Sequence, residues 1–292
     1  MRQQRVNLRQ AFAANPARFL AVASSRPVAV AAASPSDNRL LQPVLTALQP
    51  SDEPHPLADR LQVLGLSGMA RAFQQLNANR SAEEFSFEQS LFFLIEGEAA
   101  HRTKKQLSSR LRHANLRYDA SIADVDYGAV RGFDDALFHM LATGQWIANR
   151  ENAIIEGPPG VGKSWLACAL GDKACRDGRS VRYERVPQLT ADLAALHGRT
   201  PYAQRMRKLQ SVDLLILDDW GMERFSAGQR VEIFEILDRR HGQRSTLFTS
   251  PHAVETWPKM IGGTAPSAVI LDRIVHNAHR LQLNGKSLRG RQ

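Results

Sequence analysis

Residues 153–165 read AIIEGPPGVGKSW, and this stretch decides the fold of the 292-residue chain. It joins a short apolar segment to a glycine-rich loop and then to the start of a helix. Residues 157–164 fit the pattern G-x-x-x-x-G-K-[ST] at every fixed position. The three glycines allow backbone conformations and close approaches that a Cβ atom would block. A strand, this loop and a helix in that order predict a nucleotide-binding loop.

The loop predicts a set of contacts to ATP and Mg²⁺. Backbone N–H groups at a helix N-terminus bind phosphate oxygens. We expect Lys163 to reach the β- and γ-phosphates and the Ser164 hydroxyl to coordinate Mg²⁺. The full predicted nucleotide-binding set is Gly157, Pro158, Pro159, Gly160, Val161, Gly162, Lys163, Ser164 and Trp165.

A second motif predicts the other half of the site. Residues 214–219 read LLILDD, an apolar run that ends in two acids about 55 residues after the lysine. At the carboxyl end of a buried strand, Asp218 can bind Mg²⁺, and Asp219 can orient or deprotonate the attacking water. A pair of acids that caps a turn is the alternative. One candidate strand between the two motifs favours the branch of P-loop ATPases in which the water-activating acid follows the magnesium acid.

Strands and helices alternate between residues 151 and 283. The expected helices begin near Lys163, Pro187, Gly228 and Ala265. Such alternation predicts a parallel sheet with helices on both faces. The fold class is therefore α/β, with five strands expected at Ala153–Glu156, Val181–Glu184, Leu214–Asp218, Thr246–Ser250 and Arg280–Leu283.

The first half of the chain predicts two further segments. Residues 1–54 are rich in Ala, Ser and Pro without a sustained period, which favours a disordered extension over a targeting signal. Residues 55–126 show helical periodicity, with a capping box at Ser86 and Gln89, and predict a small domain that binds DNA or a partner. Residues 127–292 then form the ATPase domain, which opens with a helix at about 134–146.

The charge of the chain narrows the range of its partners, and its cysteine content indicates the cellular compartment. The net charge is +9, which favours a polyanion such as nucleic acid, although a solvated basic surface is the plainer alternative. The segment His101–Arg117 carries six Lys or Arg residues and no acid, so it can face DNA phosphates or solvent. Cys168 and Cys175 share a helix face and are expected to stay reduced in the cytoplasm. No apolar run reaches membrane-spanning length, so we expect no membrane partner.

The motifs together resemble the IstB-type helper ATPases of bacterial insertion sequences, which are relatives of DnaC-type helicase loaders in the AAA+ superfamily. The resemblance rests on the stretches 157–170, 214–221 and 270–277, and on 280–289 with its Gly-x-Ser tail. It covers roughly residues 57–289, including the helical module. It implies an AAA+ core that binds ATP, assembles as a homo-oligomer on duplex DNA, bends the DNA and delivers it to a transposase.

The resemblance also gives Arg273 a role. A guanidinium can stabilise charge on the γ-phosphoryl group, and in this family it would come from a neighbouring subunit. An ion pair with Asp272 or Asp238 is the alternative from the sequence alone.

Two features depart from the family pattern. Pro251 stands where the family has a polar amide that senses the γ-phosphate, and Thr249, Ser250 or His252 are the possible substitutes. The segment 262–266 departs from the family's acidic-Pro turn. Two other functions therefore stay open: a loader of a replicative helicase, and a non-hydrolysing DNA-binding scaffold that ATP gates.

Overall fold

The computed structural model describes residues 55–78, 85–127, 134–262 and 265–285, together with Gly132 and Ser287. All of these except His55 belong to one compact unit, Pro56–Gln292. The predicted extension 1–54 lies outside the described residues, as do residues 263 and 264 of the departing segment 262–266. No described helix has both the length and the apolar character needed to cross a lipid bilayer.

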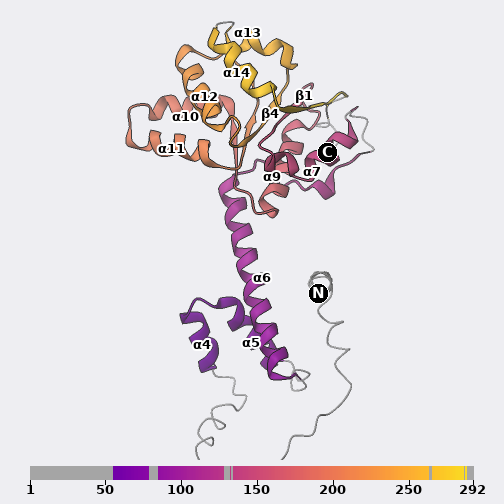
Figure 1. The fold of residues 1–292 in the computed structure, drawn as a ribbon, viewed down its shortest axis with the longest axis vertical. Helices are drawn as coiled ribbons and strands as arrows, with labels where there is room; N and C mark the ends of the chain where they lie inside the picture. Colours follow the sequence, from indigo (N-terminus) through magenta and orange to yellow (C-terminus); the bar gives the residue numbers. More distant parts are fainter. Residues whose placement is uncertain are drawn as a thin grey trace, which may run out of the picture. The chain divides into compact units, whose positions relative to one another are not determined.

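Five parallel strands form the central sheet (Figure 1). Their order is β2-β3-β4-β1-β5, so β4 lies between the strand before the glycine-rich loop and the strand that ends in the two acids. This confirms the predicted α/β fold class with a five-stranded parallel sheet, and each expected strand is present. The observed bounds are β1 Asn152–Glu156, β2 Val181–Arg185, β3 Leu214–Asp218, β4 Ser245–Ser250 and β5 Ala278–Gln282.

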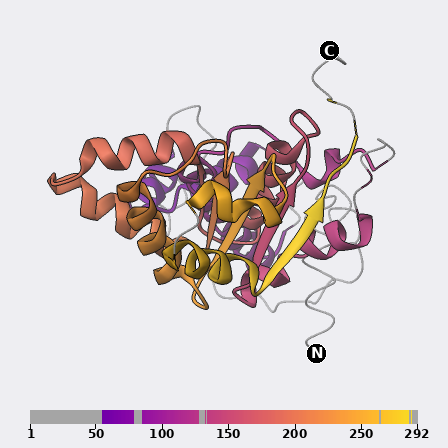
Figure 2. The ribbon, with the colours of Figure 1, turned by 90° about the horizontal axis from the view of Figure 1, so that it is seen from above.

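Helices follow the strands as expected, and two further helices lie among them in the described residues. The four predicted helix starts are each met to within one residue by α9 (Lys163–Arg176), α10 (Val186–Leu196), α12 (Ala227–Arg240) and α14 (Ala265–Val275). The sequence analysis did not anticipate α11 (Thr200–Ser211), which pairs with α10 on the side of the sheet away from β5 (Figure 2). A short α13 (Trp257–Ile261) follows a 3-10 turn, η3 (Val254–Thr256).

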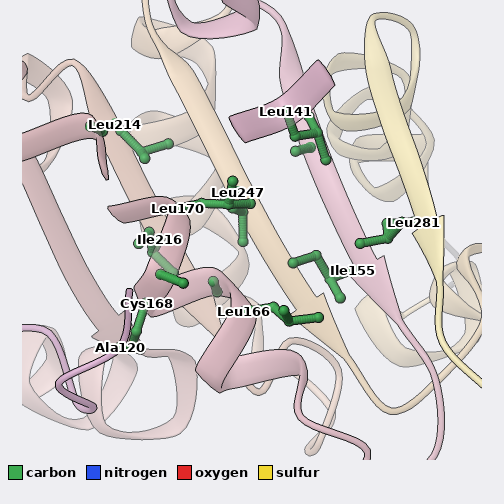
Figure 3. Packing of buried hydrophobic residues seen from close by; sticks show 14 of the residues in the cluster. Ala120, Leu141, Ile155, Leu166, Cys168, Leu170, Leu214, Ile216, Leu247 and Leu281 are labelled. Carbon is green, nitrogen blue, oxygen red and sulfur yellow. The ribbon is translucent and has the colours of Figure 1, made fainter. Parts of the chain in front are cut away.

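The core lies on both faces of the sheet. Successive residues of a strand point to opposite faces, so Ile155 packs in one hydrophobic cluster and Ile154 in the other. The first cluster brings α9 against the central strands, with Leu166, Cys168 and Leu170 among its members (Figure 3). The central strands are therefore buried on both sides, which explains their continuous apolar runs.

The helical module consists of α4 (Pro56–Val63), α5 (Ser67–Ala78) and α6 (Phe87–Ala114). The capping box that was predicted at Ser86 and Gln89 opens α6, a continuous 28-residue helix. Figure 1 shows α5 lying along the first half of α6. The last turns of α6 instead contact α9 and β2, and Leu107 and Leu111 pack against the first core cluster.

The helix expected at 134–146 is in fact two. Asp134 caps α7 (Asp135–Ala142), and α8 (Gln145–Ala148) follows after a break. Gly144 has a φ of +72° there, a left-handed conformation that ends the first helix. Before them, a 3-10 turn, η2 (Ile122–Asp124), leads out of the segment that follows α6.

Helices α5 and α6 cross at glycines, and a buried carboxylate closes the crossing. A Cβ atom at Gly68 would lie 2.6 Å from both the Glu98 Cα and the Gly97 carbonyl oxygen. The Glu98 carboxylate accepts the backbone N–H groups of Gly68 at 2.7 Å and Met69 at 3.1 Å. Although burial opposes it, hydrogen bonds from Arg102 and from these N–H groups hold the pKa of Glu98 below its ordinary value.

We predict that Gly68→Ala destabilises the helical module by about 1–3 kcal/mol, because the backbone of α6 cannot move away from the added methyl group. Chemical denaturation followed by circular dichroism measures the loss. Gly228→Ala is the matched control, since Gly228 is also helical and a Cβ atom there meets nothing within 4 Å. A stability of Gly68→Ala equal to that of the control would contradict the crossing.

The two cysteines are free and buried. Burial raises the pKa of the Cys175 thiol to about 11, and it also raises the pKa of Cys168. Because the thiolate is the reactive form, we expect neither cysteine to react with a disulfide reagent at pH 8 in the folded protein. Both should react once denaturant is added, and absorbance of the released thiol reports the count. Rapid reaction in the folded protein would show that this face of α9 opens.

Candidate functional site

The glycine-rich loop connects the carboxyl end of β1 to the first turn of α9. Gly157, Gly160 and Gly162 have φ angles of +147°, +83° and +99°, all in the region that favours glycine. Gly162 is the residue that precedes α9, so the loop N–H groups lie at the N-terminus of a 14-residue helix. This is the arrangement that binds phosphate oxygens.

The part of the chain that follows β5 also packs closely against the loop. A Cβ atom at Gly157 would lie 2.2 Å from the carbonyl oxygen of Leu283, which directly follows β5. At Gly160 it would lie 2.2 Å from the Ser287 hydroxyl. The chain after β5 therefore runs beside the loop, and the absence of side chains at these glycines serves this contact as well as phosphate binding.

The lysine and serine of the motif face the interior of the site. The Lys163 ammonium donates to the carbonyl oxygens of Gly157 at 2.7 Å and Pro158 at 2.8 Å, and the residue is 8% exposed. The Ser164 hydroxyl donates to Asp218 Oδ1 at 2.7 Å. The structure thus joins the two predicted motifs through one hydrogen bond.

Asp218 is fully buried and is surrounded by donors. Besides Ser164, the hydroxyl of Thr249 donates to Oδ1, and the hydroxyl of Tyr183 donates to Oδ2 at 2.5 Å. Burial raises the pKa of Tyr183 strongly, and its hydrogen bond to Asp218 adds to the effect. Tyr183 therefore stays protonated and acts as a donor. The guanidinium of Arg117 lies 3.9 Å from the same Oδ2.

Asp219 is held in a different way. Its φ of +62° is left-handed, which is uncommon for a residue with a side chain and turns the carboxylate away from the strand. Its N–H donates to the Thr249 hydroxyl at 3.2 Å. Its carboxylate accepts Nε and Nη2 of Arg185, at 2.9 and 2.7 Å, from the carboxyl end of β2. Asp219 is thus tied to a residue of its own chain, and that ion pair is partly exposed.

The contacts at the end of β4 show which residue can substitute for the polar amide that Pro251 replaces. Thr249 contacts both acids, because β4 lies beside β3. Ser250 instead donates to the Trp220 carbonyl and accepts the N–H of His252. Of the residues considered in place of Pro251, Thr249 is the one that lies with Asp218 and Asp219.

The sequence analysis did not identify Tyr183 or Arg185 as site residues, and it assigned Arg117 to the basic segment 101–117. Tyr183 is the middle residue of β2, and Arg185 is its last residue, in register with Asp218. Two polar side chains two residues apart, and so on the same face of the strand before the acids, are the signal that could have identified them.

Comparison with known proteins identifies the family. The family model described as IstB-like ATP binding protein matches residues 59–292, which is most of the chain.

The chain belongs to the IstB-like ATP binding protein family.

Individual relatives agree with this assignment. An insertion sequence ATP-binding protein of Sinorhizobium fredii, y4pL, is 50% identical over 238 residues, which cover 82% of this chain and 97% of the relative. An ATP-binding protein in an insertion sequence of Mycobacterium tuberculosis is 31% identical, with 81% and 94% covered. Among solved structures, DnaI has a TM-score of 0.49 at 21% identity and covers 61% of this chain and 92% of its own.

The residues of this IstB-like chain fit the Mg²⁺ and ATP that the family implies. Ser164 and Asp218 supply adjacent oxygen ligands of the kind that Mg²⁺ prefers, and Lys163 supplies a cation across the loop. The described residues contain no group of three or more His, Cys, Asp or Glu side chains that could hold a metal ion. That is expected for Mg²⁺ at a triphosphate, because phosphates and water complete its coordination.

Arg273 of the IstB-like chain lies far from the loop. It forms an ion pair with Asp238 on α12, and its guanidinium lies 5.2 Å from the centre of the Phe234 ring. The Asn152 side chain, at the amino end of β1, donates to the Arg273 carbonyl. The loop starts at the other end of that strand, about 13 Å away. Within this one chain, the structure does not bring Arg273 to the phosphate site.

The basic segment is less uniform than its sequence indicated. Arg102 pairs with Glu98, Arg110 donates to the Cys175 carbonyl, and Arg117 faces Asp218. The segment itself contains no acid, but Glu98, one turn before Arg102 on the same helix, supplies a partner from outside it. Within the described segment 101–117, the exposed cations without a salt bridge are Lys104, Lys105 and Arg112.

We predict that Thr249→Val lowers ATP turnover by about 10–100-fold, equivalent to about 1.4–2.7 kcal/mol, because both acids lose a hydrogen-bonding partner. Steady-state phosphate release measures this. Ser250→Ala is the neighbouring control and should keep turnover within a few-fold, since its hydroxyl contacts neither acid. The reverse order of effects would assign the sensing role to Ser250.

Proposed function

We propose that this chain is a DNA-dependent ATPase, which assembles on duplex DNA and assists a transposase in moving an insertion sequence. The observation that carries the proposal is the joined site: Lys163 and Ser164 on the loop, with Asp218 and Asp219 at the adjacent strand end. The names of the insertion sequence relatives support the setting.

The residues divide the chemistry among them. The loop N–H groups and Lys163 bind and orient the triphosphate, while Ser164 and Asp218 hold Mg²⁺. Bound Mg²⁺ neutralises charge on the phosphate oxygens. Asp219 orients the attacking water and accepts its proton, and Thr249 fixes the backbone of that acid.

Asp219 must be released from its ion pair with Arg185 before it can activate water. Its carboxylate is bound by Arg185, so the water-activating position requires that ion pair to open. A partly exposed pair contributes little stability, so the cost of opening it is small. We infer slow hydrolysis by the free chain and faster hydrolysis in the assembled state.

Arg273 fits a role between subunits. Its position at the amino ends of the strands excludes contact with its own phosphate site, whereas an adjacent copy can present it to a neighbour. In that arrangement the ion pair with Asp238 holds the guanidinium until assembly. The oligomer is then required for turnover.

The experiment is ATP turnover with and without duplex DNA, at low and moderate salt. We predict stimulation by DNA that weakens as salt rises, since contacts to phosphates release counterions. Lys163→Ala should abolish nucleotide binding, and Asp219→Asn should retain binding but lose turnover. Wild-type turnover by Lys163→Ala would overturn the site assignment.

Mixing two inactive variants tests the role of Arg273 in a neighbouring subunit. Lys163→Ala and Arg273→Ala should each be inactive alone, but together should recover part of the activity. Recovery follows because some interfaces pair an intact loop with an intact arginine. An active Arg273→Ala protein would instead leave the ion pair with Asp238 as the function of this residue.

The partner is tested separately. Affinity capture with the cognate transposase and with a replicative helicase distinguishes a transposition helper from a helicase loader. ATP-dependent DNA binding with no phosphate release under any condition would favour the gated scaffold, for which the Arg185–Asp219 pair is the supporting observation.

A further inference from the structure

The magnesium acid has a partner from outside the ATPase core. Arg117 lies three residues after the end of α6, in the segment that leads from the helical module into the core. Its guanidinium is 3.9 Å from Asp218 Oδ2. Tyr183 donates to that same Oδ2. Arg117 and Tyr183 therefore both face this one oxygen of Asp218.

The backbone around Arg117 is held firmly in place. Before it, Arg110 donates to the Cys175 carbonyl at 3.0 Å, and Arg182 donates to the His113 carbonyl at 3.2 Å. After it, Tyr118 packs against the first core cluster, as Leu116 does before it. A side chain that leaves such an anchored segment loses less entropy when it is ordered than one on a free loop.

The contacts divide the two oxygens of Asp218. Oδ1 accepts the hydroxyls of Ser164 and Thr249, and Oδ2 accepts Tyr183 and faces Arg117. Fixing Oδ2 fixes the rotation of the whole carboxylate. The oxygen that remains toward Ser164 is the one placed to share a cation with that serine.

We propose that Arg117 is a positioning residue of the ATP site, which acts together with Tyr183 to hold the Asp218 carboxylate with Oδ1 toward Ser164. This rests on the proposed role of Ser164 and Asp218 in holding Mg²⁺. It also removes Arg117 from the group of basic residues that DNA would contact. Residues that orient a metal ligand from behind commonly change metal affinity 10–100-fold when they are replaced.

The test is a Mg²⁺ titration of the binding of a fluorescent ATP analogue, which requires no hydrolysis. Arg117→Gln and Tyr183→Phe should each raise the Mg²⁺ concentration for half-maximal binding by about 10-fold. The double variant should shift by less than the two single changes combined, because both residues act on the same oxygen of Asp218. Arg112→Gln, an exposed arginine near the end of the same helix, should match the wild type.

Each other outcome has a defined meaning. An unchanged or lowered Mg²⁺ requirement in Arg117→Gln, or additive shifts in the double variant, would overturn the positioning role and leave the ATP site intact. Tyr183→Phe retains the buried ring and so remains informative if Arg117→Gln does not fold. A wild-type protein that binds no analogue at any Mg²⁺ concentration would overturn the proposed function itself.

Discussion

A fully buried carboxylate surrounded by hydroxyl groups is the constraint on which this structure depends. Asp218 has no access to water, so each of its oxygens requires donors from the protein. Those donors come from the loop, from β2 and from β4, and they can meet only if the strands stand in the observed order. The hydrogen bonds of the site therefore require the observed order of the strands.

Much of this could be predicted from the sequence, because its strongest signals are local. The glycine spacing at 157–164 defines a loop by conformation alone, and LLILDD defines a buried strand with acids at its end. The strands and the helices that follow them obey the handedness and layering rules of parallel sheets. The Ser86 capping box is also a short-range pattern, and it was correctly predicted.

The errors and omissions concern contacts between residues distant in the chain. The ion pair between Arg185 and Asp219 joins residues 34 positions apart, and the contact of Arg117 with Asp218 joins residues far more distant. No periodicity encodes such pairs. Arg117 appeared to be one more cation on a basic helix, because α6 could not be seen to end against α9 and β2. The break at Gly144 was missed because the apolar pattern continues through it.

Helix α6 has a mechanical consequence. Its 28 residues extend for about 42 Å without interruption, with α5 on its first half and the ATPase core against its last turns. A stiff rod that is clamped at one end works as a lever, so a small rotation at the clamp sweeps the far end through a larger arc. A rotation of the last turns of α6 would therefore displace α4 and α5 further than it displaces the residues next to the ATPase core.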